Sequence, residues 1–200
     1  MLISSLCVPT TCLGATWNSR WIRLRWPFRP TSKTLTSPVL TTPSAFTTGG
    51  DITLAENTSI ALDPSLSADG KYCGITETGT AGATLAFGDL CQLFVTDSKW
   101  YLTDANTAAG SSGDSRGKLG MCVQAAAADG ATTILLLGKI RADSKFPTFT
   151  VGAPIYVSET AGLVTSTQPT TTDVVIRVVG YGNTGDEMHF ELSGDYITHT

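Results

Sequence analysis

Histidine and charged residues are scarce in this sequence, and long apolar runs are absent from it. Among the 200 residues only His189 and His199 are histidines, so catalysis through a histidine base has few residues to draw on. No apolar run approaches the roughly 18 residues that a membrane-spanning helix requires, which excludes such a helix. Charged residues make up 15% and apolar residues 42% of the chain, a balance that argues against a disordered protein.

The cysteines form no recognisable pattern. Their number is odd, no two are spaced as CxxC, and no histidine lies near them in the sequence. The pattern therefore fits neither a disulfide framework nor a zinc site. Two of them lie in apolar, strand-like stretches, where a free thiol packs as a small hydrophobic group, and this favours synthesis in a reducing cytoplasm. The cysteines are Cys7, Cys12, Cys73, Cys91 and Cys122, of which the last two lie in the apolar stretches.

Charge is divided unevenly along the chain. Residues 1–50 contain five cations and no acidic residue, whereas residues 51–200 contain eight cations and all 17 acidic residues, a net charge of −9. An acidic body is poorly suited to binding nucleic acid, because that affinity depends on Lys and Arg contacts to phosphate. The basic segment has three open roles: contact with an acidic partner surface, contact with nucleic acid, or no contact at all.

The first 50 residues indicate an arm and linker. The opening stretch resembles a signal peptide only faintly, because it lacks a basic start and is interrupted by Pro9. A segment rich in Trp and Arg follows, and Thr/Ser/Pro-rich residues 31–50 are typical of an extended linker. Trp and Arg are common interface anchors, so the segment is either a partner-contact arm or a tail without an ordered role. The candidate contact residues are Trp17, Arg20, Trp21, Arg23, Arg25, Trp26 and Arg29.

Residues 51–200 predict an all-β domain. The chain has 32 Thr and 20 Gly, and Thr favours strands while Gly supplies turns. Short apolar runs alternate with turn signals, which is typical of a small β-barrel or β-sandwich. At most one helical turn is expected, near 107–110 or 125–128. The predicted strands are 52–55, 58–62, 71–76, 91–95, 100–103, 120–126, 132–140, 154–158, 163–166, 174–182 and 188–193.

The body also shows a weak internal repeat. Residues 84–103 align with 148–166, and residues 119–140 align with 179–197, so each copy is expected to form four strands. The alignment pairs Gly88 with Gly152, Phe94 with Tyr156, Leu102 with Val164, Gly120 with Gly180, and Gly138 with Gly194. Neither copy is large enough to bury its own apolar faces, so we expect the two similar halves to pack as one barrel or sandwich.

Candidates for chemistry are few. The sequence lacks GxSxG, P-loop, HExxH and dinucleotide-binding motifs. Carboxylates near strand ends and turns are interpreted as solvated turn residues, and no cofactor, metal or catalytic residue is predicted. Arg177 lies in a strongly apolar run, where it either points outward or pairs with an acid at a subunit interface. The carboxylates are Glu77, Asp89, Asp97, Asp186 and Glu187, and a weak calcium pattern comprises Asp104, Asn106 and Asp114.

The C-terminal half carries a resemblance to a known class of domain. The stretch PIYVSETAGLVTSTQPTTTDVVIRVVGYGNTGDEMHFELSGDYITHT resembles a β-domain of tailed-bacteriophage virion proteins, and ATLAFGDLCQLFVTDSKWYLTDAN, GKLGMCVQAA and TTILLLGKI resemble its preceding part. The resemblance covers roughly residues 70–200. Such domains occur in capsid decoration (cement) proteins, head fibres and tail fibres. They are often trimeric, and they provide no catalytic residues to transfer.

The resemblance implies a non-enzymatic structural protein made in the host cytoplasm and assembled into the virion. A capsid decoration protein on the capsid surface is the leading hypothesis, with the major capsid protein and copies of the same chain, as a homotrimer, for partners. Neither a membrane nor nucleic acid is expected as a partner. A head- or tail-fibre component that binds a host-cell receptor is the alternative, followed by a glycan-cleaving enzyme and an unrelated β-barrel binding module.

Overall fold

The computed structural model describes Asp51 and residues 53–200. Residues Leu54–Thr200 form one compact unit, which is called the body below. Within the described residues the body contains eleven strands and no helix. The expected all-β class is therefore confirmed, and the helical turn that the sequence allowed is not formed.

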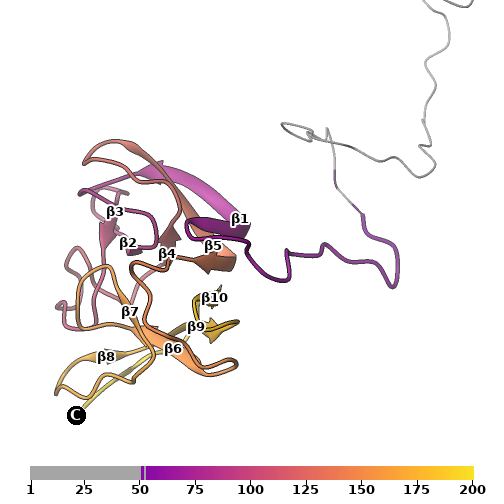
Figure 1. The fold of residues 1–200 in the computed structure, drawn as a ribbon. Helices are drawn as coiled ribbons and strands as arrows, with labels where there is room; N and C mark the ends of the chain where they lie inside the picture. Colours follow the sequence, from indigo (N-terminus) through magenta and orange to yellow (C-terminus); the bar gives the residue numbers. More distant parts are fainter. Residues whose placement is uncertain (1–50, 52) are drawn as a thin grey trace, which may run out of the picture. The chain divides into compact units, whose positions relative to one another are not determined.

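One curled sheet of nine strands accounts for most of the body (Figure 1). Its order is β3-β2-β4-β5-β10-β9-β6-β7, and β1 pairs with the opposite edge of β5, while β11 and β8 form a second, two-stranded sheet. The strands are β1 (Lys71–Thr80), β2 (Leu90–Leu93), β3 (Trp100–Leu102), β4 (Leu119–Cys122), β5 (Ala131–Arg141), β6 (Pro154–Val157), β7 (Val164–Thr165), β8 (Val175–Ile176), β9 (Val178–Gly182), β10 (Glu187–Glu191) and β11 (Ile197–Thr198).

The strand order has the two similar halves that the sequence predicted. Strands β3, β2, β4 and β5 form the first half, and β7, β6, β9 and β10 follow the same order in the second. The backbone contacts repeat as well: Gly88 N–H donates to Cys122 O at 2.8 Å, and Gly152 N–H donates to Gly182 O at 2.8 Å. Both glycines have a left-handed φ, of 84° and 76°, which explains why glycine occupies this position in each copy.

Part of the predicted alignment between the halves is wrong. Gly120 and Gly180 do correspond, because they lie opposite Cys91 and Ile155. The hairpin loops, however, are closed by Phe94 N–H to Lys99 O at 2.8 Å and by Ser158 N–H to Leu163 O at 3.2 Å.

Phe94 therefore corresponds to Ser158, whereas the sequence alignment paired it with Tyr156, two residues earlier. The match of Leu102 with Val164 is wrong by two residues as well. Ile134 lies opposite Cys122, and Met188 lies opposite Gly182. Because Cys122 and Gly182 occupy matching positions in the two halves, Ile134 corresponds to Met188, and Gly138 therefore does not correspond to Gly194. A shift of two keeps the strand period, so an apolar pattern alone does not detect it.

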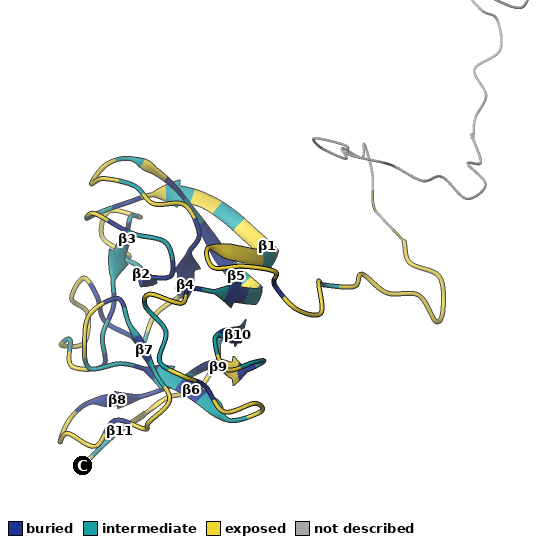
Figure 2. Ribbon diagram, in the orientation of Figure 1, coloured by how far each residue is buried: buried dark blue, intermediate teal, exposed yellow. Residues whose placement is uncertain are grey.

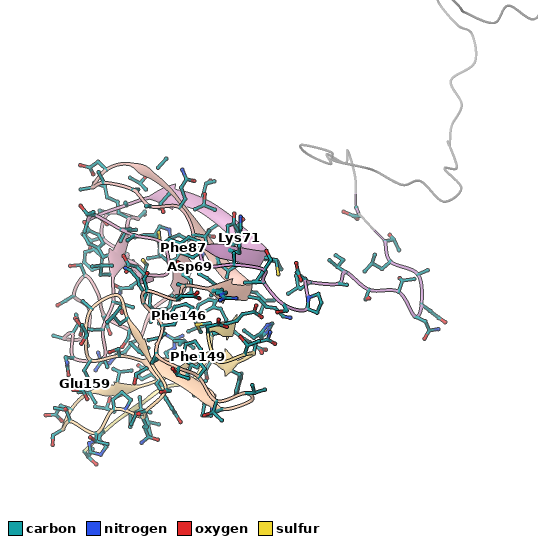
Figure 3. The ribbon with its side chains drawn as sticks, viewed as in Figure 1. Asp69, Lys71, Phe87, Phe146, Phe149 and Glu159 are labelled. Carbon is teal, nitrogen blue, oxygen red and sulfur yellow. The ribbon has the colours of Figure 1, made fainter. Side chains whose placement is uncertain are left out.

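Two apolar clusters stabilise the body. The larger one collects side chains from both halves, including Leu90, Leu135, Met188 and Phe190, and the partly buried Phe87 and Phe146 pack against it beside Phe149 (Figure 3). The smaller cluster lies in the first half around the buried Trp100, Cys91 and Cys122, among others. Because buried side chains occupy both faces of β4, that strand is apolar without alternation.

The predicted strands differ from the structure at three places. The described residues 53–62 contain no strand, because their apolar pattern finds no neighbouring strand to pair with. The predicted strand 174–182 is two strands, β8 and β9, interrupted at Arg177, whose side chain is buried. The short β11 near the C-terminus pairs with β8 and was not predicted.

Candidate interaction surface

The arm residues that the sequence marks as partner contacts lie outside the described residues. These are Trp17, Arg20, Trp21, Arg23, Arg25, Trp26 and Arg29. Their role in binding a partner stays a prediction, and the candidate surface described below belongs to the body.

Three of the candidate carboxylates are used in turns and ion pairs. Both Glu77 oxygens accept hydrogen bonds from Lys118 Nζ at 2.7 Å. Asp97 accepts the Tyr101 hydroxyl at 2.7 Å, and this hydrogen bond lowers the pKa of Asp97 below its ordinary value. Asp186 pairs with Arg141 at 2.7 Å.

The other two carboxylates, Asp89 and Glu187, are buried and tie chain segments together. Asp89 accepts Ala86 N–H at 2.7 Å and forms an ion pair with Lys145, which fixes the entry to β2. Glu187 accepts Leu66 N–H at 2.6 Å and also binds the Asn183 side-chain amide. Since Leu66 is buried too, Glu187 anchors the segment ahead of β1 to the start of β10.

The calcium-like residues hold their own loop together. Asp104 Oδ1 accepts N–H groups of Asn106 and Thr107 at 2.8 and 2.7 Å. Asp114 accepts Gly110 N–H at 2.8 Å and Arg116 N–H at 3.0 Å. In the part of the chain that the structure describes, no three His, Cys, Asp or Glu side chains gather as a metal site.

Arg177 is buried, which corrects both expectations for it. Its guanidinium neither points outward nor pairs with an acid across an interface: it donates to Ser115 O and Gly117 O at 2.6 Å each, and to Ser193 O at 3.0 and 3.1 Å. Burial lowers the pKa of Arg177 below its ordinary value, but an arginine remains charged. The side chain links the loop before β4 to the C-terminal segment.

The described cysteines, Cys73, Cys91 and Cys122, are free, as expected for Cys91 and Cys122 from their apolar surroundings. Burial raises the pKa of Cys91 well above its ordinary value and raises that of Cys122 as well. A thiol with a raised pKa is a poor nucleophile at neutral pH, because only the thiolate attacks.

The open edge of β1 is the most distinctive surface of the body. β1 is 10 residues long, about twice the common strand length, and pairs with β5 from Lys71, opposite Arg141, to Thr80, opposite Ala131. No other strand of the described body pairs with it. None of its residues is fully buried (Figure 2). Alternate residues therefore present unpaired backbone N–H and C=O groups along this edge.

This edge carries few of the features that usually prevent pairing with another chain. β1 has no proline, and its two charged residues are Lys71, labelled in Figure 3, and Glu77. Glycines at opposed positions bring β1 close to β5: a Cβ on Gly138 would overlap Cys73 O and lie 2.7 Å from Gly74 Cα. The register with β5 is irregular between Ile75 and Thr76, and the outer edge of β1 stays open to another strand.

An apolar groove of about 240 Å³ lies over β1 and its neighbour β5. It is lined by Ile60 and Leu62 ahead of β1, Gly74 and Ile75 on β1, and Leu137 on β5. Ile60 is 76% exposed, Ile75 61% and Leu137 38%. Isolated exposed apolar residues are ordinary, but several beside an open strand edge mark an interaction surface. We call the outer edge of β1 with this groove the β1 surface.

The sequence predicted a strand at 71–76 but gave no sign of this surface. Tyr, Ile and Thr residues indicate a strand, whereas the position of a strand at the edge of a sheet depends on which strands pair with each other. The one available signal is that Gly74 and Gly79 leave the strand with few large side chains to bury.

Comparisons with known proteins found no match for this chain. No described helix has the length and apolar character needed to cross a membrane. No family model matches the chain, and neither a curated protein nor a solved structure matches it.

Proposed function

We propose that this chain is a non-enzymatic structural protein of a tailed-bacteriophage virion, namely a capsid decoration protein that binds and stabilises the shell. The observation that carries the proposal is the β1 surface, an open ten-residue strand edge beside exposed apolar side chains. The resemblance of residues 70–200 to virion β-domains supplies the biological setting.

In this proposal the β1 surface takes an extended segment of the major capsid protein. Main-chain hydrogen bonds to the open edge provide affinity, and the apolar groove selects the side chains of the added segment. The chain acts as a homotrimer, made in the host cytoplasm and placed on the capsid surface, and the basic arm at residues 1–50 lies against the shell. Each large aliphatic side chain fully buried in the contact contributes about 1.5–3 kcal/mol.

A second candidate is a head- or tail-fibre component that binds a host-cell receptor. The observation that favours it is a cavity of about 370 Å³ beside β2, partly lined by Arg116 and Lys118, because receptor-binding proteins need a concave, polar site. Copy number separates the two functions, since decoration proteins are present in far greater number per particle than fibres.

Co-sedimentation with empty shells of the phage that encodes the chain tests the proposal. We expect the wild-type protein, a trimer by light scattering, to pellet with shells in near-stoichiometric amounts. Ile75→Asp should weaken this binding at least tenfold, because about 1.4 kcal/mol corresponds to a factor of ten and the charge would be buried. Val151→Asp is the matched control, because Val151 is 70% exposed and lies in the second half.

Two outcomes would contradict the proposal. A wild-type protein that stays in the supernatant refutes shell binding, and binding of cells instead would support the fibre function. Equal loss of shell binding in Ile75→Asp and Val151→Asp would show that β1 is not the contact.

A further inference from the structure

The first half of β1 presents one regular face to any strand that adds at its open edge. The register with β5 shifts only after Ile75, so the residues before that point keep the strict alternation of a strand. Lys71, Cys73 and Ile75 therefore share a face, which we call the groove face because Ile75 lines the apolar groove. Their opposite residues on β5 are Arg141, Lys139 and Leu137, in that order.

The groove face is cationic at the Lys71 end. Within the described residues, no carboxylate forms an ion pair with Lys71 or Lys139. Lys139 Nζ donates to a backbone carbonyl at 2.8 Å, which leaves its charge uncompensated. Arg141, in contrast, is paired with Asp143 and Asp186 at 2.8 and 2.7 Å. Two positive charges at this end of the face are therefore available to an acidic partner.

The same face is apolar at Ile75 and offers no competing carboxylate there. Ile75 and Leu137 line the groove and are opposed in the register. Further along β1, both oxygens of Glu77 accept hydrogen bonds from Lys118 Nζ. Glu191 lies opposite Leu137 on β10, two strands and so about 10 Å from β1. An added strand therefore meets a cation at one end and an aliphatic groove four residues away.

The sheet also indicates the direction of an added strand. Every pairing between the named strands of the body is antiparallel, and antiparallel pairing is the more stable per residue. In a segment antiparallel to β1, the residue opposite Ile75 comes first. The residue opposite Lys71 follows four positions later and points to the same face. Directly opposed side chains are the ones that interact across a strand pair.

We propose that the β1 surface recognises an extended segment in which an aliphatic residue is followed, four positions later, by Asp or Glu. This inference rests on the proposed function, in which the β1 surface is the docking edge for the capsid protein. The aliphatic side chain enters the groove beside Ile60 and Ile75, and the carboxylate lies opposite Lys71. Main-chain hydrogen bonds to the open edge hold the segment, and these two side chains select it.

Titration of the isotope-labelled full chain with synthetic peptides, followed by NMR at the amides of β1, tests this proposal. We expect the peptide STITTTES, which has the required spacing, to bind most tightly. STITTETS has the same composition but turns its acid to the other face, and it should bind about two- to fivefold more weakly. STATTTES lacks the aliphatic side chain and should bind at least about tenfold more weakly.

A charge exchange tests the acidic position. Lys71→Glu should bind STITTTKS more tightly than STITTTES, which reverses the preference of the wild type, because like charges directly opposite each other repel. Lys99→Glu is the matched control, since Lys99 pairs with Asp129 away from β1 and this variant should keep the wild-type preference.

Four results would each overturn the proposal: equal binding of STITTTES and STITTETS, an unreversed preference in Lys71→Glu, no binding below about 10 mM, and protection of the β1 amides that grows with protein concentration alone. The last of these would assign the edge to a second copy of the chain. The titration contains no shells, so its failure and that of the decoration function are distinguishable. A protein that pellets with shells but does not select STITTTES refutes the recognition pattern alone.

Discussion

Replacing Arg177 by methionine removes a buried charge while leaving a side chain of similar length. Four hydrogen bonds of 2.6–3.1 Å to the carbonyls of Ser115, Gly117 and Ser193 are lost. Each buried acceptor left without a partner destabilises the protein by about 1–3 kcal/mol. Removing a desolvated cation offsets part of that loss. We expect a net decrease of about 3–5 kcal/mol in the free energy of unfolding, a large share of the roughly 5–15 kcal/mol of a typical domain.

Urea denaturation followed by far-ultraviolet circular dichroism measures this change. Arg177→Lys serves as the comparison, because it keeps the charge but reaches fewer of the three carbonyls, so its loss should be intermediate. A methionine variant within about 0.5 kcal/mol of wild type, or more stable than it, would refute the account, because it would mean that these carbonyls find water or other donors at little cost.

Two further predictions concern the packing of the body. Gly138→Ala should destabilise the body by about 2–4 kcal/mol, because a left-handed φ of 144° and the overlap with Cys73 O both oppose a Cβ. In the same urea assay Gly194→Ala, whose new Cβ meets nothing within 4 Å, should be nearly neutral, and equal losses in both would contradict this packing.

The other prediction concerns how the stability of the body depends on pH through its buried thiols. The raised pKa values of Cys91 and Cys122 mean that above about pH 8.5 the unfolded chain releases protons that the folded chain retains. Stability is therefore complete below that pH and falls as pH rises, by up to about 1.4 kcal/mol per pH unit and thiol. Urea unfolding at successive pH values should show a flatter decline in the Cys91→Ala/Cys122→Ala variant, and identical slopes would contradict burial of the thiols.

The strand content could be predicted from the sequence because its signals are local. Apolar runs separated by Gly, Asp and Ser turns indicated most of the strands, and two glycine pairs revealed the repeated halves. The residue-by-residue match between the two halves depends on hydrogen-bond register. A shift of two residues leaves the alternation of strand faces unchanged, so the sequence pattern does not reveal it. That is why Phe94 was matched with Tyr156 although the hairpin pairs it with Ser158.

The candidate interaction surface and the role of Arg177 depend on long-range contacts and could not be predicted. The open edge of β1 follows from how β4 and β10 share the other edge of β5, which no local pattern encodes. Arg177 was recognised as unusual in an apolar run, but the carbonyls that bind it lie about 16 and 60 residues away in the sequence.

Amide hydrogen exchange of β1, measured for the protein alone and with empty capsid shells, tests the central claim most directly. In the free protein, the amides of Lys71–Thr80 that face away from β5 should exchange quickly, because nothing in the described body protects them. The account predicts that shells slow exchange at these amides while β9, inside the sheet, is unaffected. Unchanged exchange along β1 in shell-bound protein, or protection confined to another part of the chain, would contradict it.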